Sequence, residues 1–259
     1  DTVFTSPTMI AENLHNLKDF FRAHFPDYLF VNAIPTLQNE EMVFIPEKGY
    51  FRMFKFVKSS VTFNTVDNPL IAFEGAGQFG KFTRLLSFFD IKLLNITLPD
   101  FHNLTLRYDQ FEIALKKGNK DRIDECKSSI KFIKEQKEIV DTYNRIKLNK
   151  KFKKRVTHHD TKISNVLFEK NGKGLCVIDL DTVMPGYFIS DVGDMIRTYL
   201  SPVSEEEKDF SKIQIRDEYF QAIVDGYLTE MKNELSEEEK KYFVYAGKFM
   251  IYMQAIRFL

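Results

Sequence analysis

Two neighbouring stretches decide the fold: RVTHHDTKISNVLF at residues 155–168 and GLCVIDLDT at residues 174–182. In the first, the carboxylate of Asp160 precedes the amide of Asn165 by five residues, and a short apolar segment follows. The second is an apolar segment that ends at Asp179. Turn-forming Asn and Gly residues between the two segments predict a β-hairpin. We therefore expect Asp160, Asn165 and Asp179 to meet at one end of this hairpin.

These three residues have the chemistry of metal-dependent phosphoryl transfer. Carboxylate and amide oxygens suit Mg²⁺, a hard cation that usually shares its oxygen ligands with phosphates. Protein kinases use a catalytic-loop Asp, an Asn five residues later and a metal-binding Asp after a strand. The alternative is that three polar residues cap the turns of a hairpin. Each residue alone favours capping, but their joint spacing favours phosphotransfer.

Two further motifs carry weaker signals. The glycines of GAGQFG at residues 75–80 match G-x-G-x-x-G, but a dinucleotide site needs a strand before them. Here a helix is predicted to begin earlier, at Pro69, so we expect the glycines to let another backbone approach closely. His158 and His159 are both possible metal ligands, but neighbours on an extended segment point to opposite faces. A metal ion shared by this pair is therefore disfavoured.

Composition limits the remaining classes of protein. The chain has 259 residues and equal numbers of basic and acidic residues, 37 of each, so it lacks the electrostatic signature of a nucleic-acid-binding protein. No apolar run approaches the roughly 18–20 residues needed to cross a bilayer, and the first residues lack a secretion-signal pattern. Cys126 and Cys176 are far apart in sequence, which fits a reducing compartment. We expect a cytoplasmic globular protein without nucleic-acid or membrane partners; its oligomeric state stays open.

The first part of the chain reads as a helix followed by strands. Pro7 begins a pattern of helical spacing through Ile10, Leu14, Leu17 and Phe21. Three segments are then typical of strands, and the last of them, apolar on both faces, is expected to be covered on both sides. These segments are residues 28–34, 42–45 and 50–57.

The rest of the chain reads as mainly helical. Helices are predicted from Pro69 onward and over residues 121–146. Two capping boxes, Ser204-x-x-Glu207 and Ser236-x-x-Glu239, are predicted to begin helices, the second continuing to the end of the sequence. The layout indicates an α+β protein of two unequal lobes, a small β-rich one over residues 1–57 and a larger helical one over residues 58–259.

The fuller motif resembles that of a known superfamily. His158-x-Asp160-x₄-Asn165, followed by Ile178-Asp179-x-Asp181, is similar to the aminoglycoside phosphotransferase and choline kinase superfamily, whose fold is protein-kinase-like. The strings VIDLDTVMPG at residues 177–186 and DVGDMIR at residues 191–197 resemble N-acetylhexosamine 1-kinases in particular.

The resemblance extends over most of the chain, with two departures. Such kinases have a glycine-rich loop over the ATP phosphates before the first helix, and they run on beyond the position of Leu259. Neither part has a counterpart here. We therefore expect the sequence to be part of a longer chain with an incomplete N-terminal lobe.

The resemblance implies roles for individual residues. The adenine of ATP would lie under a hinge that includes Phe54, Phe56 and Val57. Asn165 and Asp179 would hold Mg²⁺ on the triphosphate, and Asp160 would orient the attacking sugar hydroxyl and accept its proton. Asp181, Thr182 and Arg257 would contact the substrate. Lys162 would balance the charge of the acidic cluster.

Other functions remain open within the same resemblance. A choline, ethanolamine or aminoglycoside kinase would need an acidic or aromatic pocket for its cationic substrate, and the balanced charge gives no support for one. A nucleotide-binding pseudokinase is the non-enzymatic alternative. It is disfavoured because a pure binding module has no need of the base Asp160. The resemblance thus implies an ATP-dependent kinase whose acceptor is the anomeric hydroxyl of an N-acetylhexosamine.

Overall fold

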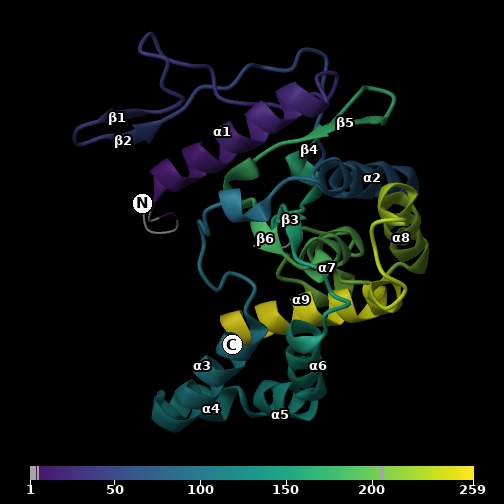
Figure 1. The fold of residues 1–259 in the computed structure, drawn as a ribbon. Coiled ribbons are helices and arrows are strands. Elements are labelled where there is room, and N and C mark those ends of the chain that lie inside the picture. Colours follow the sequence, from purple (N-terminus) through teal and green to yellow (C-terminus); the bar gives the residue numbers. More distant parts are fainter. Residues whose placement is uncertain (1–3, 5, 205–206) are drawn as a thin grey trace.

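The computed structural model describes residue 4, residues 6–204 and residues 207–259. Helices dominate, and short strands lie between and above them (Figure 1). The hairpin of β1 and β2 and helix α1 form the end of the molecule opposite α3–α6 (Figure 1). Between these ends lie two further short strand pairs, flanked by α2, α7, α8 and α9. The structure is a mixed α+β fold, as predicted.

The strands form three separate antiparallel pairs among the described residues. The hairpin predicted from residues 166–177 is present, because β4 and β5 pair directly through a turn in which Gly172 has a φ of +88°. Val61 extends that pair by exchanging two backbone hydrogen bonds with Phe168. The pairs are β1 (Val43–Ile45) with β2 (Gly49–Phe51), β3 (Arg155–Thr157) with β6 (Met184–Gly186), and β4 (Val166–Phe168) with β5 (Gly174–Val177).

The helices follow the predicted order, and short 3₁₀ turns separate several of them. The α-helices are α1 (Pro7–His24), α2 (Pro69–Leu85), α3 (Leu104–Lys117), α4 (Lys120–Glu125), α5 (Lys127–Glu135), α6 (Glu138–Leu148), α7 (Phe188–Tyr199), α8 (Asp217–Met231) and α9 (Phe243–Phe258). The 3₁₀ turns are η1 (Ile91–Leu93), η2 (Ile163–Asn165), η3 (Leu180–Thr182), η4 (Phe210–Lys212) and η5 (Glu239–Tyr242). No helix among these described residues is both long and apolar enough to span a bilayer.

Helix α1 forms as its spacing predicted. Its four apolar positions, Ile10, Leu14, Leu17 and Phe21, are all buried. The ring of Phe21 stacks on that of Tyr28, so the residues after the helix fold back over it.

The glycines of α2 serve helix packing and not phosphate binding. A Cβ atom on Gly80 would stand 3.0 Å from the carbonyl oxygen of Tyr227 in α8. From the other side, a Cβ on Gly226 would overlap the carbonyl oxygen of Phe73, at 2.1 Å. Asn68 caps the helix by accepting a hydrogen bond from the amide of Leu70. The prediction of a close backbone approach at these glycines is confirmed, and the phosphate-loop alternative is wrong.

Of the three strands predicted in the first part of the chain, the one at residues 42–45 is confirmed as β1, the one at residues 50–57 is present only at its start, and the one at residues 28–34 is wrong. Residues 28–34 form no strand and meet residues 50–57 at one bridge, Ala33 with Phe54, because the two segments run alongside each other for too short a distance. Strand β2 ends at Phe51. The segment expected to be covered on both sides is open, since the side chains of Met53 and Phe56 are 70% and 79% exposed.

The helix predicted over residues 121–146 is three helices. The chain leaves helical geometry at Cys126 and again at Gln136, both with ψ near +15°. These two bends let Ile133 in α5 and Val140 in α6 be buried against the same core. Neither break contains a glycine or a proline. We therefore attribute the bends to the burial of side chains and not to local helix propensity.

The capping box at Ser236 is confirmed in full. The Ser236 hydroxyl accepts from the amide of Glu239 at 3.1 Å, and a Glu239 carboxylate oxygen accepts from the amide of Ser236 at 2.8 Å. Glu239 is also fully buried and receives two hydrogen bonds from the Arg155 guanidinium, at 2.7 and 2.9 Å. The box therefore joins the start of the last helical segment to strand β3. The other predicted box, at Ser204, includes residues 205–206, which lie outside the described residues; the described residues 207–209 are not helical, and a Glu207 carboxylate oxygen accepts from the amide of Asp209.

Candidate active site

Asp160 and Asn165 are in direct contact. The amide nitrogen of Asn165 donates to the backbone carbonyl of Asp160 at 2.9 Å and to its carboxylate oxygen Oδ2 at 3.0 Å. The backbone carbonyl of Asn165 accepts from the amide of Ile178 at 2.9 Å, which connects the pair to the residue before Asp179. The hairpin thus brings the two ends of the motif together.

Asp179 lies at the end of β5 in left-handed backbone geometry, with φ +59° and ψ +58°. Aspartate tolerates this region better than most side chains. Burial raises the pKa of the Asp179 carboxyl, and the neighbouring charges of Asp181 and Asp160 raise it further, while Lys162 and Arg52 act in the opposite direction. Three carboxylates therefore lie close enough to influence one another.

The donor set at this point fits Mg²⁺ shared with phosphates. Asn165 uses its amide nitrogen for Asp160, which leaves its side-chain oxygen as the ligand atom. Asp179 is a carboxylate repelled by two others, and a divalent cation relieves that repulsion. In the described residues no three His, Cys, Asp or Glu side chains gather as a metal site by themselves. A site of two protein oxygens completed by phosphates is the arrangement Mg²⁺ commonly takes.

The loop that carries Asp160, residues 158–161 (the HHDT loop), is held by two buried carboxylates of α7. Asp191 accepts hydrogen bonds from the amides of His158 at 3.0 Å and His159 at 2.8 Å. Asp194, one turn further along, accepts from the amide of Thr161 at 2.8 Å. Burial raises the pKa of Asp191 to about 7, partly offset by the two amides. Sequence reasoning missed both residues as loop supports, although their spacing of three marks one face of a helix.

The two histidines of the loop point to different places. His158 is buried, its Nε2 lies 2.9 Å from the carbonyl oxygen of Ile178, and its ring meets Phe79 edge to face. Burial lowers the pKa of His158, which keeps the ring neutral. His159 lies against Ser190 instead. The interpretation that this pair does not share a metal ion agrees with these positions.

An apolar cavity of about 480 Å³ adjoins Asp179. The three hinge residues expected to contact adenine, Phe54, Phe56 and Val57, all contribute to its wall. Its size is within the range of small-molecule sites, roughly 300–1,000 Å³. We call it the hinge cavity; its lining is Leu14, Val31, Arg52, Phe54, Lys55, Phe56, Val57, Ser60, Leu167, Ile178, Asp179, Leu180 and Asp181.

Arg52 neutralises one of the carboxylates at the hinge cavity. Its guanidinium lies 2.5 Å from Oδ2 of Asp181, and each side chain is 19% exposed. The same guanidinium lies over the ring of Phe54, at 5.4 Å from its centre. Sequence reasoning did not assign Arg52 a role, because its partner lies 129 residues away and no spacing rule connects them.

The remaining predicted site residues lie in different places and have different contacts. Lys162 lies 3.4 Å from Oδ1 of Asp160, which suits the charge-balancing role. Thr182 is buried and donates its hydroxyl proton to the carbonyl of His158 at 2.6 Å, so it also supports the HHDT loop. Arg257, at the end of α9, does not line the hinge cavity; partial burial and the charges of Arg107 and Arg197 lower its pKa.

Known structures share this fold at low sequence identity. An aminoglycoside phosphotransferase from Alicyclobacillus acidocaldarius superposes with a TM-score of 0.53 and 13% identity, over 97% of this chain and 83% of the other. An ethanolamine kinase from Plasmodium vivax gives a TM-score of 0.52 and 14% identity, over 99% of this chain and 65% of the other. These likenesses establish a protein-kinase-like fold, in agreement with the sequence-based prediction.

The family follows from a direct match of the sequence. Residues 47–232 match the family described as APH, the phosphotransferase enzyme family. The matched region covers well over half of the chain and includes the HHDT loop, Asn165 and Asp179. The chain belongs to the APH phosphotransferase enzyme family.

Proposed function

We propose that this chain is an ATP- and Mg²⁺-dependent kinase that transfers the γ-phosphate to the anomeric hydroxyl of an N-acetylhexosamine. One observation carries the kinase reaction: Asn165 clamps Asp160 by two hydrogen bonds while Asp179 lies beside them at the wall of an apolar cavity. In this proposal a base, a metal-binding pair and the nucleotide cavity lie in one region.

The nucleotide occupies the hinge cavity in this proposal. Phe54 and Val57 supply apolar surface for the adenine ring, and Asn165 and Asp179 hold the ion on the phosphates. When bound, Mg²⁺ neutralises charge that develops on the transferred group. The division of the chain into lobes at residue 57 belongs to the same proposal, because it puts the hinge between the two lobes.

Asp160 orients the attacking hydroxyl and accepts its proton. Its Oδ2 is occupied by the Asn165 amide, so Oδ1 is the atom that faces Lys162, 3.4 Å away, and the acceptor. The two α7 carboxylates fix the backbone on both sides of Asp160. Phosphoryl transfer depends on such positioning, since the reaction requires little covalent chemistry of the protein.

The choice of a neutral acceptor rests on the resemblance of residues 177–186 and on one ion pair. Asp181 would be the obvious anchor for a cationic substrate such as choline, but Arg52 already neutralises it at 2.5 Å. A cation would therefore have to displace a guanidinium. A sugar needs hydrogen bonds and no net charge, so it suits this environment better.

A substrate panel tests this function. We expect the protein, given Mg-ATP, to phosphorylate an N-acetylhexosamine in preference to neutral hexoses, choline, ethanolamine and aminoglycosides. Phosphorus NMR of the product should show an anomeric phosphate. A 6-phosphate, or turnover with choline alone, would refute the sugar 1-kinase assignment and leave the phosphotransferase family unaffected.

The metal assignment has its own test. Asp179→Ala should abolish Mg²⁺-dependent binding of a non-hydrolysable ATP analogue in calorimetry, because Asn165 alone supplies only a neutral oxygen. Asp109→Ala, an exposed carboxylate on α3, is the matched control. An unaltered affinity with unaltered metal dependence would mean that Asp179 is only a turn residue.

A further inference from the structure

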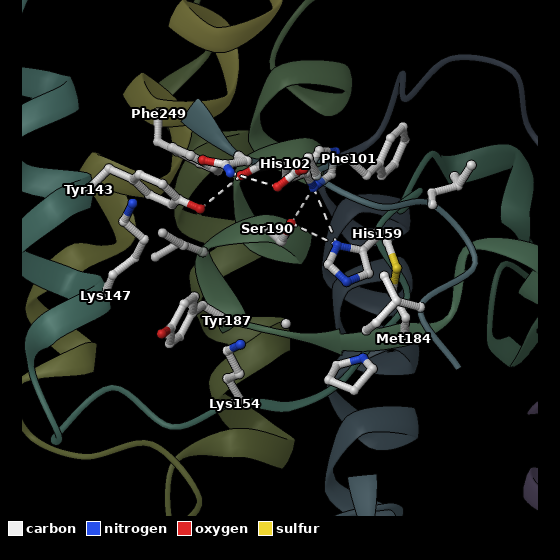
Figure 2. A pocket seen from close by; sticks show the side chains of 17 residues that line it. Phe101, His102, Tyr143, Lys147, Lys154, His159, Met184, Tyr187, Ser190 and Phe249 are labelled. Carbon is white, nitrogen blue, oxygen red and sulfur yellow. Dashed lines mark hydrogen bonds between the residues drawn. The ribbon is translucent and has the colours of Figure 1, made fainter. Parts of the chain in front are cut away.

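A second cavity, of about 420 Å³, lies in the helical part of the molecule (Figure 2). It is enclosed by the segment 96–103, strand β6 and the start of α7, with α6 and α9 behind them. Neither Asp160 nor Asp179 lines it, so it is distinct from the hinge cavity. We call it the histidine cavity, after His102 and His159 in its wall.

The histidine cavity has an unpartnered polar atom in its wall. Nδ1 of His159 lies 3.0 Å from the Ser190 hydroxyl, which is also in contact with Nδ1 of His102. Nε2 of His159 has no hydrogen-bond partner among the described residues, although the residue is only 6% exposed. The Met184 carbonyl favours the protonated ring but makes no hydrogen bond of normal geometry with it. In Figure 2 this nitrogen is turned away from Ser190, toward the space among the labelled side chains.

The missing hydrogen bond at Nε2 has an energetic cost, and the position of the His159 ring is fixed. A buried polar group without a partner costs about 1–3 kcal/mol, so a native protein seldom keeps one without reason. His159 is fixed in left-handed geometry, with a φ of +68°, by the hydrogen bond from its amide to Asp191. The ring cannot easily turn elsewhere. A ligand with a polar group at this place would supply the missing partner.

The charged residues of the cavity are mainly basic. Lys147 lies over the ring of Tyr143, donating to the Thr105 hydroxyl at 2.7 Å, and Lys154 lies over the ring of Tyr187. Neither ammonium has a carboxylate within ion-pair distance in the part of the chain that the structure describes.

The other ionisable groups leave that positive charge in excess. Burial keeps both histidines neutral: it lowers the pKa of His159 to about 3 and that of His102 well below its usual value. Asp100 is the acidic member of the lining, and it accepts a hydrogen bond from Asn103 at 2.7 Å. Two ammonium groups against one carboxylate favour an anion.

We propose that the histidine cavity binds the phosphate monoester of a small hydroxylated molecule, with its phosphate at Lys147 and Lys154 and a hydroxyl at Nε2 of His159. A phosphate monoester carries about −1.5 to −2 charges at neutral pH, which matches two ammonium groups. The carbon skeleton would pack on the aromatic rings of Phe101 and Tyr187. A hydroxyl can donate or accept, so it satisfies Nε2 in either tautomer.

Calorimetry with glucose 6-phosphate as the probe tests the proposal. The titration uses the full chain saturated with Mg²⁺ and a non-hydrolysable ATP analogue, so that the hinge cavity is filled. We expect binding of glucose 6-phosphate and much weaker binding of glucose, which lacks the phosphate, and of gluconate, which carries a carboxylate. Binding does not depend on turnover, so the result stands whatever acceptor the kinase uses.

Two variants locate the site. Lys154→Gln should weaken binding of glucose 6-phosphate about tenfold or more, the usual effect of removing a charged hydrogen-bond donor. Lys150→Gln, an exposed lysine on the same segment but outside the lining, should leave it unchanged. His159→Asn keeps a side chain that tolerates positive φ and should also weaken binding. Circular dichroism checks that this variant folds, and Lys154→Gln carries the test if it does not.

Three results would overturn the proposal. They are equal affinity for glucose, equal affinity for gluconate, and binding of glucose 6-phosphate that Lys154→Gln does not weaken. Displacement of glucose 6-phosphate by the nucleotide analogue would equally place it in the hinge cavity and not here.

Discussion

The HHDT loop and the hinge segment, residues 51–57, are built in opposite ways. In the loop, the amides of His158, His159 and Thr161 donate to buried carboxylates of α7, and both histidine rings are buried. In the hinge segment, the backbone meets the preceding chain where Phe51 pairs with Val43 and where the amide of Ile34 donates to the carbonyl of Met53, and large apolar side chains are exposed. The HHDT loop is held by buried hydrogen bonds, whereas the side chains of the hinge segment are exposed to solvent.

This difference matches what the proposed function requires of each region. Proton transfer and metal binding depend on atoms held to within a fraction of an ångström, which buried charged hydrogen bonds provide. Binding a planar apolar ring needs only backbone groups and surface, which tolerate more variation. Variants in the two regions should therefore have effects of very different size.

The largest effect is expected inside the loop. Asp160→Asn should remove most turnover, by roughly 10²- to 10⁴-fold, because the amide cannot accept the proton of the hydroxyl. Folding and nucleotide affinity should stay near those of the parent, since Asn still accepts from Asn165. Steady-state kinetics with calorimetry measures both. A variant that keeps half of its activity would sink the assignment of Asp160.

The support of the loop should matter next. Asp191→Ala leaves the amides of His158 and His159 without their acceptor inside the protein, at a cost of about 1–3 kcal/mol for each group. We expect the free energy of unfolding, measured with urea, to fall by several kcal/mol. Asp109→Ala, exposed on α3, should change it by less than about 0.5 kcal/mol. Equal losses in the two variants would mean that Asp191 does not clamp the loop.

The same carboxylate should give stability a pH dependence. Burial raises the pKa of Asp191 from 3.8 to about 7, so between these values the folded protein holds a proton that the unfolded chain has released. The stabilisation from this group is complete below about pH 4 and is lost as the pH rises toward 7. Melting temperatures of the parent and of Asp191→Asn, compared from pH 4 to 8, measure it. An identical slope in both proteins would contradict the assignment.

The smallest effect is expected in the hinge segment. Phe56→Ser should alter the free energy of unfolding by less than about 0.5 kcal/mol, because the ring is already 79% exposed. It should nevertheless weaken binding of the ATP analogue, since the ring lines the hinge cavity. A large loss of stability with unchanged nucleotide affinity would reverse the comparison drawn between the two regions.

The sequence predicted the features that depend on local spacing. The Asp160–Asn165 pair, the hairpin before Asp179, the close helix contact at Gly80 and the capping box of Ser236 all involve short intervals or residue types with few alternatives. Each could be read without knowing what packs against it.

Features decided by distant partners escaped prediction. Arg52 meets Asp181 across 129 residues, and the carboxylate of Asp191 meets an amide more than thirty residues earlier. Apolar alternation in residues 50–57 indicated a covered strand, yet alternation cannot tell whether anything lies over it. The bends at Cys126 and Gln136 serve the burial of Ile133 and Val140, which only the assembled core reveals.

The junction between Glu239 and Arg155 also orders events during synthesis. Strand β3, which leads into Asp160, holds a guanidinium that becomes a buried, paired group only when Glu239 arrives, 84 residues later. Until translation has passed that point, the arginine must stay in water, because a buried charge without a partner is strongly unfavourable. A chain that ends before Glu239 therefore lacks the partner with which Arg155 can be buried three residues before the HHDT loop.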